Sequence, residues 1–180
     1  ILGKQHNHFE TLFLLGALSS NIGKKDLAVT LLKEAILIRP DHAEAHNNLA
    51  IAFLSKGNLN AAVKSFKNAV IFDPEYVEAH FNLGIALQQS GELDEAVKSF
   101  KSVVELKSDY AEAYFNMGVI YHEKGKFDEA LDCYEQAVAI KPDYVEVLNN
   151  IGDVLQRKGR FDEAIKSYTR AIYHKPDFAE

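Results

Sequence analysis

The stretch Asn116–Pro142, NMGVIYHEKGKFDEALDCYEQAVAIKP, is the unit that the rest of the chain repeats. Its pattern of apolar, small and turn residues predicts two short amphipathic helices that are joined at Gly125 and end at Pro142. The same landmarks recur every 34 residues. A fixed period of roughly 20–50 residues indicates a stacked array of repeats rather than one globular core.

The repeat boundaries predict a single array that covers the chain. We expect an all-α fold, an α-solenoid of antiparallel helix pairs. Residues 1–8 would be the tail of a preceding repeat, and residues 179–180 would open a following one. The five full repeats are residues 9–42, 43–76, 77–110, 111–144 and 145–178.

Each repeat has residues suited to its turns. A glycine such as Gly125 falls where the first helix must end, and glycine tolerates the left-handed conformation found there. Asp128 and its equivalents are expected at the start of the second helix. Asp143 and Glu146, with the Asp-x-x-Glu spacing, resemble a capping box for the next first helix.

Small residues are expected to set the helix spacing. Gly118 on the first helix should oppose Ala130 on the second, with Tyr134 filling the space beyond. Small side chains let two helix axes approach toward the lower end of the usual spacing of about 8–10 Å.

The charge and composition of the chain argue against some classes of function. The net charge is −6, and a mildly acidic chain without a basic block is a poor candidate for nucleic-acid binding. No apolar run approaches the roughly 20 residues that span a bilayer, so we expect no membrane insertion. Cys133 is the only cysteine, which fits a reducing compartment, and we predict the cytoplasm. The chain starts at Ile1 rather than a methionine, so a targeting segment could be missing.

The pattern resembles the tetratricopeptide repeat family over nearly the whole chain. The resemblance implies a right-handed superhelix whose concave wall is lined by the first helices. Two departures are that Val103 replaces a small alanine and that no repeat has the family's first-helix tryptophan. The residues that carry the resemblance, with equivalents in the other repeats, are Gly118, Tyr121, Gly125, Ala130, Tyr134, Ala137 and Pro142.

The distribution of charged residues indicates which surface of the array binds a partner. The first-helix face, defined as positions 5, 6, 9, 12 and 13 of each repeat, has 25 sites and only three charges: Glu123, Asp153 and Arg157. The outward face of the second helices (positions 18, 19, 22, 25 and 26) has 17 charges in 25 sites. Charge-rich faces are typically solvated, whereas a low-charge face with large apolar residues usually binds something.

The first-helix face supplies the candidate site. Asparagines at one position of four successive repeats could pair with peptide groups, because a primary amide has both a donor and an acceptor. Apolar residues beside them would bury ligand side chains. The candidate peptide-binding residues are Asn47, Asn48, Ile51, Phe81, Asn82, Ile85, Phe115, Asn116, Val119, Asn149 and Asn150.

Structural roles for these residues remain open. The asparagine row could brace neighbouring repeats, and Phe81 and Phe115 could be half-buried between helices. The Glu146 series is better explained by helix capping than by ligand recognition. The asparagine row also resembles the N-terminal array of O-GlcNAc transferases and their bacterial relatives, where such residues hold the backbone of protein substrates.

No catalytic, cofactor or metal site is expected. His42, His46 and His80 could form a metal cluster, but packing roles fit their positions better. Cys133 has no sequence neighbour that would activate it, which favours a structural role. An active site is one asymmetric constellation, whereas this chain is five near-copies.

Two functions from different classes follow. The first is a non-enzymatic scaffold that binds an extended protein or peptide segment in the concave groove. The alternative is the substrate-docking arm of a larger enzyme, such as an O-GlcNAc-type glycosyltransferase. Self-association through the open ends of the array is a third expectation.

Overall fold

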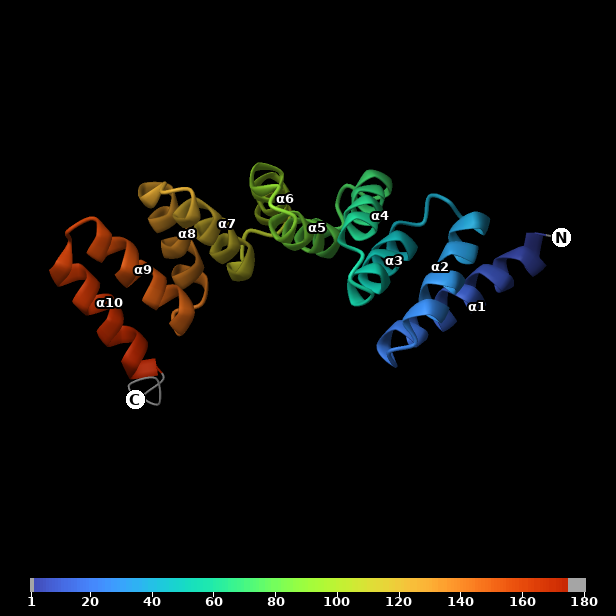
Figure 1. Ribbon diagram of the computed structural model, residues 1–180, viewed down its shortest axis with the longest axis horizontal. Coiled ribbons are helices and arrows are strands. Elements are labelled where there is room, and N and C mark those ends of the chain that lie inside the picture. Colours follow the sequence, from blue (N-terminus) through green and yellow to red (C-terminus); the bar gives the residue numbers. More distant parts are fainter. Residues whose placement is uncertain (1, 175–180) are drawn as a thin grey trace. The chain divides into compact units, whose positions relative to one another are not determined.

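The structure is a computed structural model, and it describes the backbone of residues 2–174 and the side chains of residues 8–174. Over this range the chain forms ten α-helices and no strand (Figure 1). The helices are α1 (Leu2–Asn21), α2 (Lys25–Ile38), α3 (Ala43–Ser55), α4 (Leu59–Phe72), α5 (Val77–Gln89), α6 (Leu93–Leu106), α7 (Ala111–Glu123), α8 (Phe127–Ile140), α9 (Val145–Arg157) and α10 (Phe161–His174).

Helix starts agree with the 34-residue frame in four repeats. Helices α3, α5, α7 and α9 begin at Ala43, Val77, Ala111 and Val145, the first residues of the second to fifth repeats. The first repeat differs, because α1 runs without a break from Leu2 through Phe9. Residues 2–8 therefore extend the first helix of this repeat. Ile1, the end of the fifth repeat, and the two residues assigned to a following repeat lie outside the described residues.

The predicted glycine turns are present. Gly125 has a φ of 70°, in the left-handed region that glycine adopts without strain. Its N–H donates to the His122 carbonyl at 2.9 Å, and the Lys126 N–H donates to the Tyr121 carbonyl at 2.9 Å. This pair of bonds is the Schellman arrangement, which satisfies carbonyls that the end of α7 would otherwise leave unpaired.

Asp128 lies at the start of the second helix as predicted, whereas the capping-box prediction for Asp143 was wrong by one residue. Asp128 is the second residue of α8, after the capping residue Lys126, so it acts on the helix dipole rather than as a cap. Asp143 precedes Tyr144, which is the N-cap of α9 and makes no side-chain capping bond. The Tyr144 ring packs against Phe115 on α7, with centroids 5.3 Å apart, and this residue rather than the acidic one holds the capping position.

The glycine of the first helix faces the large aromatic residue of the second helix instead of the predicted alanine. A Cβ atom on Gly118 would lie 2.4 Å from Tyr134 Cε1, and one on Gly152 would lie 2.5 Å from Tyr168 Cε1. The glycine thus makes room for the large side chain of the second helix. Ala130, the expected neighbour, is fully buried.

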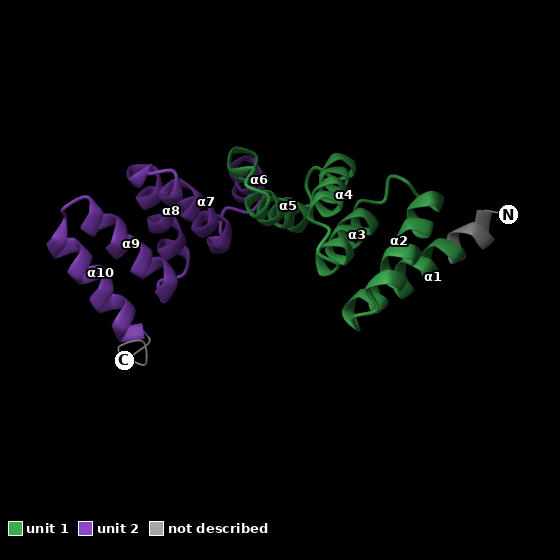
Figure 2. Ribbon diagram, viewed as in Figure 1, with its two compact units in different colours: residues 1–96 green, residues 97–180 purple. Residues whose placement is uncertain are grey.

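The chain divides into two compact units, Ile1–Ala96 and Val97–Glu180 (Figure 2). In unit 1, the core between α1, α2 and α3 is built around Phe9, Leu32 and Leu49. In unit 2, Tyr134, Leu148 and Val154 lie at the centre of the core that joins α8, α9 and α10. Each core is shared by neighbouring helix pairs, as expected for an α-solenoid.

Candidate peptide-binding face

In unit 1, two asparagines of the first-helix face form a hydrogen-bonded relay. Asn82 Nδ2 on α5 donates to Asn47 Oδ1 on α3 at 3.2 Å, and Asn47 Nδ2 donates to the Tyr76 hydroxyl at 3.3 Å. Asn47 is only 1% exposed, so this amide links repeats instead of facing a ligand. Burial raises the pKa of Tyr76 to about 12, which keeps the hydroxyl neutral.

The other candidates of unit 1 are accessible. Asn48 is half-buried, and its amide makes no hydrogen bond with any residue of the described part of the chain. Ile51, one helical turn further along α3, is 36% exposed. Phe81 and Ile85 on α5 are half-buried. These residues form a surface of an unsatisfied amide and apolar side chains, without a charged group.

In unit 2, the asparagine row has two different roles. Asn150 Nδ2 on α9 donates to the Tyr134 hydroxyl on α8 at 3.4 Å. Asn116 Nδ2 donates to the backbone carbonyl of Glu112 on its own helix at 2.7 Å. Asn150 therefore braces two repeats, whereas the Asn116 bond is local to α7.

Phe115 lies against two aromatic residues of its own repeat, Tyr134 on α8 and Tyr144 at the start of α9. Its ring centroid is 6.2 Å from that of Tyr134 and 5.3 Å from that of Tyr144. Val119 packs beside it against the same core. Both side chains are half-buried, as is Asn149. The half-buried arrangement left open by the sequence is the one observed for Phe115.

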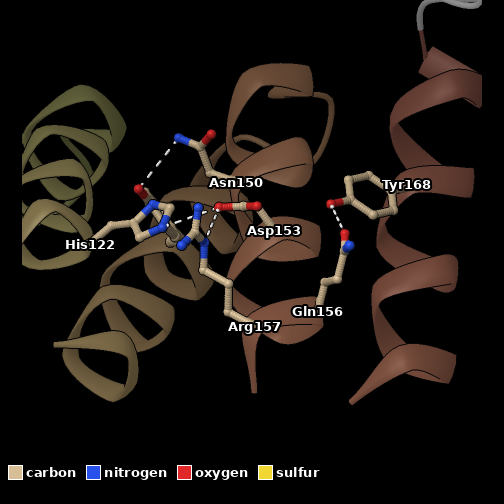
Figure 3. Close-up of polar contacts among 7 residues, drawn as sticks. His122, Asn150, Asp153, Gln156, Arg157 and Tyr168 are labelled. Atoms are coloured by element: carbon tan, nitrogen blue, oxygen red, sulfur yellow. Dashed lines mark hydrogen bonds and ion pairs between the residues drawn. The ribbon is translucent and has the colours of Figure 1, made fainter. Parts of the chain in front are cut away.

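A polar cluster on α7 and α9 was not included among the candidate residues. His122 Nε2 lies 3.1 Å from Asp153 Oδ2, and Arg157 Nε donates to the same oxygen at 3.0 Å. Figure 3 shows both side chains converging on Asp153. Two of the three charges on the first-helix face are therefore paired with each other. The signal was present in the sequence, because all three residues occupy positions 9, 12 and 13 of the face.

The histidines have packing roles. His46 Nε2 is 2.8 Å from the Pro40 carbonyl, and His80 Nε2 is 2.9 Å from the Pro74 carbonyl. Each ring thus ties the start of a first helix to the preceding turn. His42 accepts the Ala45 N–H at Nδ1 and caps α3, and burial lowers its pKa.

Cys133 is a free thiol on α8. Burial raises its pKa to about 11, so the reactive thiolate is scarce at neutral pH. A structural role agrees with this environment.

Profiles of a known protein family match most of the chain. A family profile described as TPR repeat matches residues 52–91, 87–125 and 118–159, and two tetratricopeptide repeat profiles match residues 9–42 and 145–178. The chain belongs to the tetratricopeptide repeat family. The fold class, an α-solenoid, is thereby confirmed. Members of this family generally act as interaction modules. No helix in residues 2–174 is both long and apolar enough to span a membrane.

Solved tetratricopeptide repeat structures superpose closely on this chain. One crystal structure of MamA has a TM-score of 0.86 at 29% identity, covering 91% of this chain and 96% of MamA. YrrB, described as a TPR protein with an unusual peptide-binding site, has a TM-score of 0.82 at 22% identity, covering 92% of this chain and 86% of YrrB. PilF of Pseudomonas aeruginosa has a TM-score of 0.78 at 20% identity, covering 95% of this chain and 78% of PilF. No curated protein sequence matches the chain.

Proposed function

We propose that this chain is a non-enzymatic protein-interaction scaffold whose first-helix face holds an extended segment of a partner protein. The observation that carries the proposal is the accessible surface of α3 and α5. There the Asn48 amide has no partner in the described structure and lies on the same helix face as the exposed side chain of Ile51.

The spacing suits an extended peptide. Neighbouring helices lie roughly 10 Å apart, and an extended chain advances about 3.3 Å per residue. The step from Asn48 to Asn82, or from Asn116 to Asn150, would thus span about three peptide residues. Ile51 and Phe81 in unit 1, and Phe115 and Val119 in unit 2, would bury the ligand side chains between the two amides.

Asn48 and Asn116 are the residues that test this proposal best. The Asn82 and Asn150 amides brace repeats, so their loss would also affect stability. Asn48 has no such bond, and Asn116 bonds only to its own helix. Gln136, an exposed amide on α8 in the same repeat as Asn116, is the matched control.

The experiment selects ligands from a random peptide library displayed on phage and measures their affinity by fluorescence anisotropy. We expect the double variant Asn48→Ala/Asn116→Ala to bind about tenfold more weakly, since one or two lost hydrogen bonds contribute about 1–2 kcal/mol. Gln136→Ala should bind like the wild type. N-methylation of the peptide backbone should weaken binding more than replacing polar peptide side chains. Selected peptides that bind the double variant at full strength would refute the proposal.

The asparagine row also supports a second candidate, the docking arm of a larger enzyme such as an O-GlcNAc-type glycosyltransferase. The same face would then present a protein substrate to a catalytic domain in the same polypeptide. Sequencing the gene beyond the codon for Glu180 separates the two. A downstream nucleotide-sugar-binding domain would support the arm, and an immediate stop codon would exclude it.

Self-association is a third proposal, carried by exposed apolar side chains on two helices. Helix α1 exposes Leu14, Leu15 and Leu18, and α10 exposes Phe161 and Ile165. Apolar patches of this kind commonly mark interaction surfaces. Sedimentation velocity at increasing concentration should show a dimer that Leu18→Ser or Ile165→Ser weakens; a strictly monomeric wild type would exclude it.

A further inference from the structure

A pocket of about 350 Å³ lies in unit 1, away from the first-helix face. The second helices α2 and α4 form its walls, and α3 forms its floor. Its lining residues are Lys33, Ile36, Leu37, His46, Leu49, Lys64, Ser65 and Asn68.

The floor of the pocket is preformed. His46 is 6% exposed and is held by its hydrogen bond to the Pro40 carbonyl and by stacking on Phe72, with ring centroids 5.2 Å apart. Leu49 beside it is buried in the core. A ligand would therefore meet a rigid apolar floor, which limits the entropic cost of binding.

The rim is apolar on one side and exposed to solvent. Leu37 lines the pocket and is 81% exposed, whereas Ile71, at the equivalent position of the next repeat, is 68% exposed and lies outside the lining. The third and fourth repeats have Glu105 and Ala139 at this position, so large exposed aliphatic residues here distinguish the first two repeats from their neighbours. Exposed aliphatic residues beside a pocket favour an apolar ligand group.

The charges at the rim are positive. Lys33 and Lys64 come from adjacent second helices, and neither makes an ion pair with a residue of the described part of the chain. Lys33 instead lies over the Phe53 ring, with Nζ 5.5 Å from the centroid. No Asp or Glu is among the lining residues, although the whole chain has a net charge of −6.

We propose that this pocket is a second docking site, which binds an acidic amphipathic segment of a partner protein. A large apolar side chain of that segment would enter the pocket, and carboxylates on either side of it would pair with Lys33 and Lys64. The charge complementarity argues for an acidic partner, and the apolar floor argues for an apolar anchor. This site is independent of the first-helix face.

The probe is a fluorescein-labelled eleven-residue peptide with a central phenylalanine, two flanking leucines and glutamate elsewhere. A matched peptide with lysine in place of glutamate is the ligand control. Anisotropy titrations with the whole chain should show binding of the acidic peptide only, and added salt should weaken it.

Two sets of variants locate the site. The double variant Lys33→Glu/Lys64→Glu and the single variant Leu37→Asp should each weaken binding at least tenfold. The matched control is Lys101→Glu/Lys166→Glu, which reverses lysines at the same two repeat positions elsewhere in the chain and should bind normally. Helical circular dichroism should be unchanged in all of them, because these side chains are exposed.

Several outcomes would overturn the proposal. These are no binding of the acidic peptide, equal weakening by the control variant, or weakening by Asn48→Ala/Asn116→Ala, which would assign the peptide to the first-helix face. Dimerisation of the wild type that Leu37→Asp abolishes would identify a second copy of the chain as the occupant instead.

Discussion

The ring of Tyr134 occupies the space that a side chain at Gly118 would need, since a Cβ atom there would lie 2.4 Å from Tyr134 Cε1. The ring is fully buried, and its hydroxyl accepts a hydrogen bond from Asn150. It is therefore fixed both by packing and by the asparagine row. Tyr134 therefore connects the packing within its own repeat, at Gly118, with an asparagine of the first-helix face in the next repeat, Asn150.

Gly118→Ala should destabilise the protein by about 1–3 kcal/mol through overpacking, even though alanine is the better helix former. The penalty should shrink in a Tyr134→Phe background, because the ring then loses its bond to Asn150 and can shift. The second repeat has this combination naturally, with Ala50 and Phe66 both fully buried. Urea unfolding of the two single variants and the double variant measures the coupling. Additive losses would contradict this explanation.

Asn150 and Asn116 should differ in their effect on stability although they occupy the same repeat position. Asn150→Ala removes a bond between repeats and should cost about 0.5–1.5 kcal/mol. Asn116→Ala removes only a bond to its own helix and should cost less than about 0.5 kcal/mol. Thermal unfolding of both variants checks this. Equal losses would mean that the Tyr134–Asn150 bond does not brace the repeats.

His42 should make stability fall under mildly acidic conditions. Its pKa is lowered by burial, so between its folded pKa and the ordinary histidine value of 6.5 the unfolded state binds more protons. Stability therefore rises with pH across that window and is lost as pH falls. Protonation also removes the Nδ1 lone pair that accepts the Ala45 N–H.

His42→Asn keeps a capping side chain without titrating near neutral pH. Urea unfolding at pH 7.5 and pH 5.5 should show a smaller loss for this variant than for the wild type. His80→Asn is the control, since His80 lies in the third repeat and bonds the Pro74 carbonyl instead of capping a helix. An unchanged pH dependence in His42→Asn would exclude His42 as its source.

Cys133 should react slowly with a thiol reagent in the native protein. A pKa raised from 9.0 to about 11 lowers the thiolate fraction near pH 8 by about a hundredfold, and the thiolate is the reactive form. Ellman's reagent in buffer and in denaturant measures the ratio of rates. Equal rates would show that the thiol is accessible and not shifted.

Much of the fold was predictable from the sequence because it depends on near neighbours. Gly125 adopts a left-handed conformation within its own turn, and α9 begins at Val145, the first residue of its predicted repeat. The capping box was misassigned by one residue because the capping position is held by Tyr144, whose ring packs against Phe115, 29 residues earlier on α7. Neighbour contacts of that kind cannot be read from a helix-start pattern.

The sequence by itself determined the period, the helix pairs and the low-charge face, since each depends on residue spacing within 34 positions. Only the tertiary structure decided that Asn47 is a buried brace whereas Asn48, the next residue, is half-buried with an unpaired amide. The partner of Asn47 is Tyr76, 29 residues away, and that of Asn150 is Tyr134, 16 residues away. Asparagines of the same helix face thus acquire different roles, because packing against the neighbouring helix decides which amides bond within the protein and which stay unpaired.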